Sequence, residues 1–317
     1  MKAAIVTEKG KNPIYGDFEE PSAKGDNVVV KVTASALSNL TKMRAMGKHY
    51  SSATVYPNIA GTDGVGTLDG QRVYFLATNS PYGTLAEKTL VNQNMVIPLP
   101  DGIDDITAAA IANPGMSSWA ALVSRAHFEK DQTVLINGAT GVAGSLAVKI
   151  AYHLGAKKVI VTGRNAKKLN DLGADVAIDF DMDADGGKDK FTVDLAEQFQ
   201  NGVDVVLDYL WGDSALSIMK AVAKFGGNNI TRYVSIGASA GQPEINLPSA
   251  LLRSSAIEIL GSGVKSATMS QLKSAISEVF QWAAKEHITM ETNDFKLMDI
   301  EQAWAAPLRP RAVVKVK

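Results

Sequence analysis

The sequence predicts an α/β protein that combines a β-rich domain with a doubly wound parallel-sheet domain. Up to about residue 97, apolar residues alternate with period two between glycines and prolines, which is typical of short strands. From Thr133 onward, apolar strands alternate with helical segments, which is typical of a parallel sheet covered on both faces. A chain of 317 residues is also long enough for about two domains.

The first half of the chain predicts short strands followed by a pair of helices. Asn113-Pro114-Gly115 is expected to separate these helices, because proline lacks a backbone N–H and glycine weakens a helix. The expected strands are 27–33, 71–76 and 85–91, and the expected helices are 106–112 and 116–126.

The second half predicts strands and helices in strict alternation. The expected strands are 133–137, 158–162, 176–178, 203–208, 231–236 and 258–261, and the expected helices are 142–154, 166–172, 193–200 and 214–223. The acidic stretch 181–190 lacks the ligand order of a calcium loop, so it is expected to be a solvated loop. A helix at 269–285, a short helix at 299–306 and a strand at 312–316 close the chain.

Composition excludes several classes of function. The net charge of −1 gives no general attraction to nucleic acid or to an anionic membrane. No apolar run approaches the roughly 20 residues of a membrane helix, and the N-terminus does not have the pattern of a signal peptide. The chain contains no cysteine, which excludes disulfides and thiolate metal sites. A cytoplasmic protein is expected.

The glycine turn after the strand at 133–137 predicts a dinucleotide site. The spacing G-x-G-x-x-G runs from Ala139, in the first glycine position, through Gly141 to Gly144. Gly141 lets the backbone approach a pyrophosphate, and the following helix directs its N–H groups at the phosphates. The expected cofactor contacts of this turn are Thr140, Gly141, Val142 and Ala143.

The end of the next strand favours NADPH over NADH. An NAD-binding protein carries Asp or Glu near this point, whereas this chain has Gly163 and Arg164, followed by Lys168. A guanidinium can bind the 2′-phosphate of NADPH, which a carboxylate would repel. The alternative is a solvated basic start of a helix.

Motifs along the whole chain, taken in order, resemble the medium-chain dehydrogenase/reductase superfamily and specifically its zinc-free quinone oxidoreductase branch. The motifs are V-T-A-S-A-L at 32–37, P-N-I-A-G-T-D-G-V-G at 57–66, G-T-L-A-E at 83–87, P-L-P-D at 98–101, the segment 108–122, the glycine turn, L-G-A-D at 172–175, D-V-V-L-D at 204–208, V-S-I-G at 234–237 and A-V-V-K-V at 312–316. The resemblance implies a GroES-like catalytic domain at 1–112, completed by 263–317, and a Rossmann domain at 113–262. It also implies a cofactor cleft between them and a homodimer.

The residues at the zinc positions of related alcohol dehydrogenases argue against a metal. The first catalytic segment reads Leu37-Ser38-Asn39-Leu40 without the cysteine, and the G-H-E triplet is replaced by Gly61-Thr62-Asp63. The four histidines show no ligand spacing, so no metal is expected.

The resemblance also suggests catalytic residues. Ser38 and Asn39 are expected near the nicotinamide, although relatives often have Asn-Pro-x-Asp at 38–41. Tyr50 is a candidate donor to the acceptor oxygen, with His49 as a competitor and simple loop packing as the alternative. Thr62 either lines the pocket or serves as a turn hydroxyl. The cofactor contacts implied on the other domain are Ser117, Gly237 and Gly261.

These features predict a zinc-independent oxidoreductase that transfers hydride from NADPH to a quinone or an α,β-unsaturated carbonyl. Without a Lewis acid, a conjugated acceptor is the easier substrate, because conjugation spreads the incoming charge onto oxygen. Two alternatives stay open: an NADPH-binding sensor or scaffold without turnover, and a zinc-free alcohol or carbonyl dehydrogenase.

Overall fold

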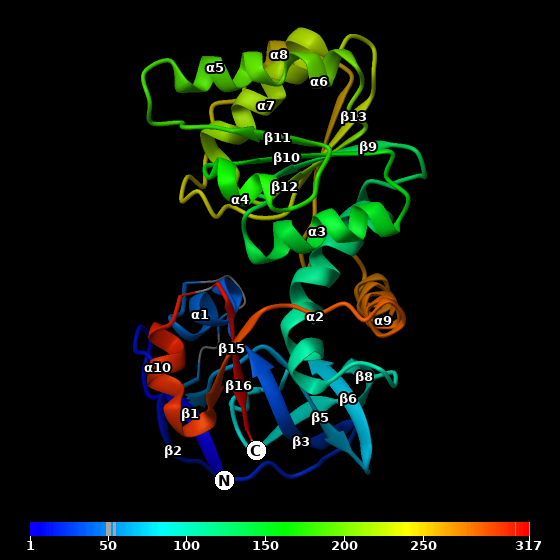
Figure 1. The fold of residues 1–317 in the computed structure, drawn as a ribbon. Helices are drawn as coiled ribbons and strands as arrows, with labels where there is room; N and C mark the ends of the chain where they lie inside the picture. Colours follow the sequence, from blue (N-terminus) through cyan, green and yellow to red (C-terminus); the bar gives the residue numbers. More distant parts are fainter. Residues whose placement is uncertain (49–51, 53–54, 308, 317) are drawn as a thin grey trace. The chain divides into compact units, whose positions relative to one another are not determined.

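The computed structural model describes residues 1–48, 52, 55–307 and 309–316, and the chain divides into two compact units (Figure 1). The β-rich unit comprises Met1–Asn113 and Ile276–Lys317, and the parallel-sheet unit comprises Pro114–Ala275. The predicted α/β fold class, with a β-rich part and a doubly wound parallel sheet, is confirmed.

The β-rich unit is built around a sheet with the strand order β15-β16-β3-β5-β6-β8, in which β7 also pairs with β3. A smaller sheet has the order β2-β1-β4. The bounds are β1 Lys2–Val6, β2 Ile14–Asp17, β3 Asn27–Ala36, β4 Asn58–Ile59, β5 Asp63–Leu68, β6 Gln71–Leu76, β7 Lys88–Asn92, β8 Val96–Pro98, β15 Thr292–Lys296 and β16 Arg311–Lys315; the helices are α1 Asn39–Ala45 and α10 Ile300–Ala305.

The C-terminal strand β16 completes the larger sheet of the β-rich unit. Val313 pairs antiparallel with Ala36 of β3, and the other edge of β16 pairs parallel with β15. Val313 and Val314 are fully buried, which explains why the apolar end of the sequence forms a strand. The last strand therefore stabilises the same sheet that carries β3 and β5.

The parallel-sheet unit contains the sheet β11-β10-β9-β12-β13-β14, and its neighbouring strands are paired parallel. Helices α3 and α4 lie on one face and α5 to α8 on the other (Figure 1). The strands are β9 Thr133–Asn137, β10 Lys158–Gly163, β11 Val176–Asp179, β12 Val205–Asp208, β13 Thr231–Ser235 and β14 Ile257–Gly261; the helices are α3 Val142–His153, α4 Ala166–Asn170, α5 Gly187–Asp194, α6 Ala196–Gln200, α7 Gly212–Phe225 and α8 Ser249–Arg253.

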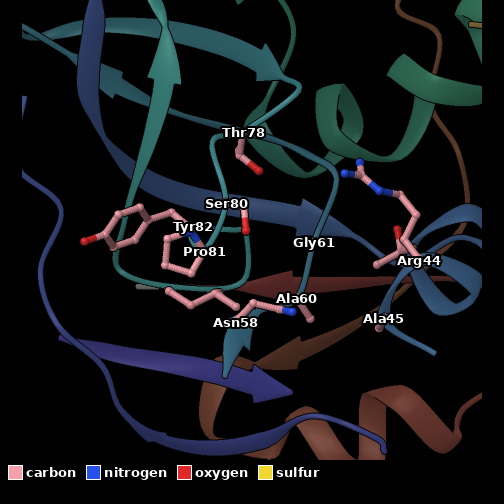
Figure 2. A pocket seen from close by; sticks show the side chains of 11 residues that line it. Arg44, Ala45, Asn58, Ala60, Gly61, Thr78, Ser80, Pro81 and Tyr82 are labelled. Carbon is pink, nitrogen blue, oxygen red and sulfur yellow. The ribbon is translucent and has the colours of Figure 1, made fainter. Parts of the chain in front are cut away.

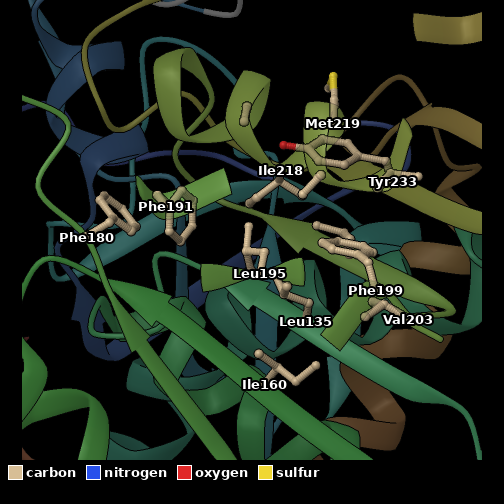
Figure 3. Packing of buried hydrophobic residues seen from close by; sticks show 14 of the residues in the cluster. Leu135, Ile160, Phe180, Phe191, Leu195, Phe199, Val203, Ile218, Met219 and Tyr233 are labelled. Carbon is tan, nitrogen blue, oxygen red and sulfur yellow. The ribbon is translucent and has the colours of Figure 1, made fainter. Parts of the chain in front are cut away.

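One face of this sheet packs against α5 to α7 through a cluster of buried apolar side chains (Figure 3). Leu135 and Ile160 come from β9 and β10, and both are fully buried. Strands that are buried on both faces need continuous apolar runs, which is the pattern that the sequence shows here.

The structure corrects the expected loop at 181–190. Helix α5 begins at Gly187 and ends at Asp194, and α6 follows from Ala196. Phe191, Leu195 and Phe199 are spaced four residues apart and are almost completely buried, so they form one apolar stripe along the helices. Helix therefore begins before residue 193, where it was predicted to start. The ring of Phe191 lies 4.7 Å from that of Phe180, measured between centroids.

The predicted break at Pro114 is also wrong. Helix α2 runs from Asp105 to Trp119 with Pro114 inside it, and a π-helical segment, Ala120–Arg125, follows. Interior proline costs about 3 kcal/mol, but residues 108–112, four alanines and Ile111, are fully buried and favour helix. Ser117 and Ser118 both donate their hydroxyl protons to the Pro114 carbonyl, at 2.9 Å. Helix α9, Met269–Glu286, matches its prediction closely.

Candidate active site

The turn between β9 and α3 has the backbone geometry of a phosphate-binding turn. Gly138 has a φ of +87°, which side chains other than glycine rarely adopt. A Cβ atom on Gly144 would lie 2.5 Å from the Gly138 carbonyl oxygen, so glycine is needed for α3 to start this close to the turn. Gly141 is the exposed N-cap of α3 and places no side chain over the N–H groups of Val142 and Ala143. These groups therefore fit an anionic phosphate.

The ends of the parallel strands are aligned along one edge of the sheet. In the register, Asn137 pairs with Thr162 and with Asp208, while Ser235 pairs with Asp208 and with Gly261. Ligands of open parallel sheets bind beyond this carboxyl edge. Three of the predicted cofactor residues stand at this edge or just beyond it: Gly163, Gly237 and Gly261.

A buried polar network, which was not predicted from the sequence, fixes these strand ends. The Asn137 amide donates to Asp208 at 2.8 Å, and the Thr162 hydroxyl donates to Asn137 at 2.8 Å. Asp208 also accepts backbone N–H groups of Leu210 and Trp211. Burial raises the pKa of Asp208 against the lowering effect of these donors. The signal that could have found the network is a polar residue at the end of three apolar strands.

The end of β10 carries an exposed cluster of positive charge. Arg164, Lys167 and Lys168 are all exposed, and their side chains have no hydrogen-bond or ion-pair partner among the residues that the structure describes. Asn165 caps α4 by accepting the backbone N–H of Lys168 at 2.9 Å, which fixes the turn that presents these cations. A group of free cations beside a dinucleotide turn fits a phosphate monoester.

Gly163 and Thr140 bring this basic cluster next to the glycine turn. A Cβ atom on Gly163 would lie 3.5 Å from the Thr140 methyl group, so the Gly163 backbone lies next to the Thr140 side chain. Thr140 is only partly buried. The predicted residues of the turn and of the β10 end are therefore neighbours in the structure.

Ser117 lies in α2, and its hydroxyl bonds within the helix to the Pro114 carbonyl. The adjacent Ser118 is fully buried and lies 2.7 Å from the Tyr209 hydroxyl, just after β12. Burial raises the pKa of Tyr209, so this phenol stays protonated. The role of Ser117 at the nicotinamide stays a prediction.

In the β-rich unit, a chain of hydroxyl groups connects α1 to β5. The Ser38 and Thr41 hydroxyls lie 2.9 Å apart, and those of Thr41 and Thr62 lie 3.3 Å apart. The Thr62 hydroxyl lies 2.6 Å from one carboxyl oxygen of Asp63, and the Tyr74 hydroxyl donates to the other at 3.0 Å. We call Ser38, Thr41, Thr62 and Asp63 the hydroxyl chain.

Local backbone structure explains why these four residues meet. Ser38 is the N-cap of α1, and its side chain accepts the backbone N–H of Thr41 at 3.0 Å. Gly61 has a φ of +111°, and a Cβ atom there would lie 2.2 Å from the Thr84 hydroxyl oxygen. Only glycine allows this turn, which leads into Thr62 and β5.

The Asp63 carboxyl is buried, and its surroundings both raise and lower its pKa. Burial is the largest influence and raises its pKa, while the bonds from Thr62 and Tyr74 and the charges of Arg311 and Arg44 lower it. Arg311 is 5% exposed, and its Nε and Nη2 atoms have no hydrogen-bond partner within the described residues. Asp63 therefore has a buried cation in its surroundings that compensates for its ionised form.

The structure brings Ser38 and Thr62 together through Thr41 but separates Asn39 from them. Asn39 is exposed at the start of α1, and its side chain does not join the hydroxyl chain. Tyr50 and the competing His49 lie outside the described residues. Thr41 and Asp63 were not predicted, although both stand in segments that the sequence motifs had marked.

A small hollow opens beside the hydroxyl chain in the same unit (Figure 2). It has a volume of about 50 Å³, which is room for several water molecules. Thr41 and Arg44 of α1 form one part of its wall, and Ser80 and Tyr82 of the loop after β6 form another.

The donor set at Ser38 and Thr62 does not fit a zinc ion. Catalytic zinc takes cysteine, histidine or carboxylate ligands, whereas these side chains offer neutral hydroxyl groups that are already bonded to one another through Thr41. In the portion of the chain that the structure describes, no group of three or more histidine, cysteine or acidic side chains is close enough to hold a metal.

Fold and site together define a dinucleotide-binding protein of the Rossmann type. A family model described as zinc-binding dehydrogenase matches residues 143–284, which do not include Ser38 or Thr62. The chain is 31% identical over 244 residues to 2-methylene-furan-3-one reductase of Solanum lycopersicum, covering 69% of this chain and 60% of the relative. It is 30% identical over 249 residues to the chloroplastic NADPH-dependent alkenal/one oxidoreductase of Arabidopsis thaliana, covering 71% and 61%.

The solved structure of a quinone oxidoreductase from Thermus thermophilus has the same fold. Its TM-score is 0.80 at 24% identity, and the match covers 100% of both chains. The resemblance to the medium-chain dehydrogenase/reductase superfamily and its quinone oxidoreductase branch is thereby confirmed. The chain spans about 60% of the length of the two curated relatives. Within the described ranges, no helix is both long enough and apolar enough to cross a membrane.

Proposed function

We propose that this protein is an NADPH-dependent reductase of conjugated carbonyl compounds, either quinones or α,β-unsaturated ketones and aldehydes. The observation that carries the proposal is the glycine turn of β9 and α3 with the free cations Arg164, Lys167 and Lys168 beside it. The names of the two curated relatives, 2-methylene-furan-3-one reductase and NADPH-dependent alkenal/one oxidoreductase, support the same chemistry.

The residues of the parallel-sheet unit would bind and orient the cofactor. The N–H groups at Val142 and Ala143 fit its pyrophosphate, and Arg164 with Lys168 fits the 2′-phosphate. Gly261 leaves open backbone at the end of β14, where the nicotinamide is expected, because nothing lies within 4 Å of a Cβ atom built on it. Gly237 lies against the Tyr209 backbone instead, since a Cβ atom there would be 2.9 Å from the Tyr209 carbonyl oxygen, and its place at the nicotinamide stays a prediction. Bound NADPH would supply the hydride.

The β-rich unit would stabilise the acceptor. As hydride adds to a conjugated acceptor, negative charge develops on its carbonyl oxygen, and a positioned hydrogen-bond donor lowers the barrier. Ser38 is a hydroxyl donor held by its neighbours in the hydroxyl chain, and Thr62 lies behind it in the same chain through Thr41. Tyr50 and Asn39 remain candidate donors.

Stopped-flow mixing tests the proposal directly. Protein loaded with NADPH is mixed with benzoquinone and with methyl vinyl ketone, and loss of the reduced-nicotinamide absorbance is followed. We expect rapid oxidation with at least one acceptor and slower oxidation with NADH in place of NADPH. Tight NADPH binding without oxidation by any acceptor would instead support the sensor or scaffold alternative. Oxidation of simple alcohols with NADP⁺ would support the alcohol dehydrogenase alternative.

We also propose a role for each of the two domains, a homodimer and a cytoplasmic location. The catalytic domain is taken as 1–112 completed by 263–317, and the cofactor domain as 113–262. Strand β14 is the edge of its sheet and exposes Ile259, which supports a homodimer formed through that edge. A cytoplasmic location is also proposed. Sedimentation analysis and cell fractionation test these two points.

A further inference from the structure

We propose that the hydroxyl chain stores and delivers the proton of the reduction, with Asp63 as the acid and Ser38 as the group that donates to the substrate oxygen. This inference rests on the proposed function. Four oxygen-bearing side chains lie in series from Asp63 through Thr62 and Thr41 to Ser38, with separations of 2.6, 3.3 and 2.9 Å. A hydride donor supplies no proton, so a reductase of this kind needs a separate source.

The direction of the hydrogen bonds depends on whether Asp63 carries its proton. When Asp63 is ionised, Thr62 donates to it, Thr41 donates to Thr62, and Ser38 donates to Thr41. Every hydroxyl proton of the chain is then used inside the chain.

When Asp63 is protonated, the whole order reverses. Asp63 donates to Thr62, Thr62 donates to Thr41, and Thr41 donates to Ser38. The Ser38 oxygen already accepts the backbone N–H of Thr41, and among the described residues its own proton then has no acceptor. The protonated chain therefore presents one free donor, at Ser38, which is 8% exposed.

The transfer is balanced. Bound NADPH would supply the hydride for the new C–H bond and would become NADP⁺, and the acceptor oxygen would take the displaced π-electron pair. That oxygen takes the Ser38 proton, Ser38 takes the proton of Thr41, Thr41 takes that of Thr62, and Thr62 takes that of Asp63. Asp63 ends as a carboxylate, and a solvent proton later restores it.

The surroundings of Asp63 fit both of its charge states. Burial favours the protonated carboxyl, while Arg311, Arg44 and the Tyr74 hydroxyl favour the carboxylate that forms after transfer. Thr41 lines the water-sized hollow, which gives solvent protons a short route back to the chain. The Thr41–Thr62 separation of 3.3 Å is the longest in the series, so this link is expected to limit transfer.

The test uses the 317-residue protein with variants that break or keep the hydroxyl chain. Thr62→Val removes one hydroxyl at nearly constant volume, and Asp63→Asn removes the acid. For both, we expect turnover with benzoquinone and methyl vinyl ketone to fall about 100-fold, the size of a general-acid contribution, while the Kd of NADPH is unchanged. Thr62→Ser keeps a hydroxyl and should restore turnover.

Two further variants separate proton delivery from packing. Ser35→Ala removes a buried hydroxyl that bonds the Asp63 backbone carbonyl at 2.9 Å but lies outside the chain. It should not reproduce the loss. Tyr74→Phe removes a donor to the Asp63 carboxylate, so the fall in turnover with rising pH should move to higher pH.

Infrared difference spectra of the cofactor-free protein give a readout that does not need activity. A protonated-carboxyl band that titrates in the wild type should vanish in Asp63→Asn and shift in Thr62→Val. Equal turnover and equal pH profiles in wild type and Thr62→Val would overturn the inference, as would an equal loss in Ser35→Ala. If the wild type failed to oxidise NADPH with every acceptor tested, the proposed function itself would be refuted, and the inference with it.

Discussion

Removing the Arg164 side chain should weaken the binding of NADPH but not of NADH. Arg164 follows β10 beside the glycine turn, and its guanidinium has no partner within the described part of the chain. A hydrogen bond to a charged group contributes about 1.5–3 kcal/mol. Because Arg164 is exposed, screening by water and salt places it at the lower end of that range. A loss of about 1.4 kcal/mol corresponds to a tenfold rise in Kd.

Isothermal titration calorimetry of Arg164→Ala with each dinucleotide measures this difference. The Kd of NADPH should rise about tenfold, and that of NADH should stay near the wild-type value, since NADH lacks the 2′-phosphate. The NADPH affinity of the wild type should also fall more steeply with salt than that of the variant. Lys149→Ala is the matched control, because it removes an exposed cation from the side of α3 rather than from the end of β10.

Three results would refute this reasoning. Equal weakening of NADPH and NADH would show that Arg164 acts on the fold or on the shared pyrophosphate. No change for either would assign the 2′-phosphate to other groups. An equal effect of Lys149→Ala would reduce the role of Arg164 to general positive charge.

Three further predictions concern stability. Gly144→Ala should lower the free energy of unfolding by about 1–3 kcal/mol, because its Cβ atom would lie 2.5 Å from a carbonyl oxygen. Gly141→Ala, whose Cβ atom would have its nearest contact at 3.4 Å, should unfold in urea like the wild type but bind NADPH more weakly. Phe199→Ala should cost about 3–5 kcal/mol in the same assay, and a loss typical of an exposed site would contradict its burial. Burial raises the pKa of Asp63 in the folded chain above its pKa in the unfolded chain. The contribution of Asp63 to the free energy of unfolding is therefore complete below the unfolded-state pKa and is lost as pH rises through the folded-state pKa. Urea titrations at several pH values should therefore show a smaller decline in Asp63→Asn, with the remaining decline partly due to Asp208, whose pKa burial also raises.

The fold around the candidate cofactor turn was predictable because it depends on local sequence. A strand, a glycine turn and a helix are contiguous between Thr133 and His153, and the requirement for glycine at 144 comes from atoms only a few residues away. The strand ends beyond it were placed correctly because the order of a parallel sheet follows from alternating strands and helices. What the sequence did not reveal is the Asn137–Asp208 bond, which joins two neighbouring strands 71 residues apart in the chain.

Helix limits were harder to predict where packing outweighs local preference. From the sequence alone, the unfavourable effect of Pro114 on helix stability predicts a break. The burial of the alanines before it, which stabilises the helix, is visible only in the folded chain. Local sequence was also misleading at α5, where charged residues around Lys188 and Lys190 suggested a loop but a helix forms. There the buried ring of Phe191 decides the structure.

The hydroxyl chain shows why a substituted metal position is difficult to interpret from sequence alone. Ser38 and Thr62 stand where zinc enzymes carry ligands, and from the sequence one could conclude only that the metal donors are missing. In the structure, Thr41 fills the space between them, and Asp63 ends the series as a buried acid. Replacing cysteine and histidine ligands by hydroxyl groups removes the donors for a Lewis acid, but it leaves these residues able to pass a proton. A site of this kind would suit acceptors that already carry a conjugated carbonyl, because such acceptors need only a proton donor at the oxygen as hydride adds.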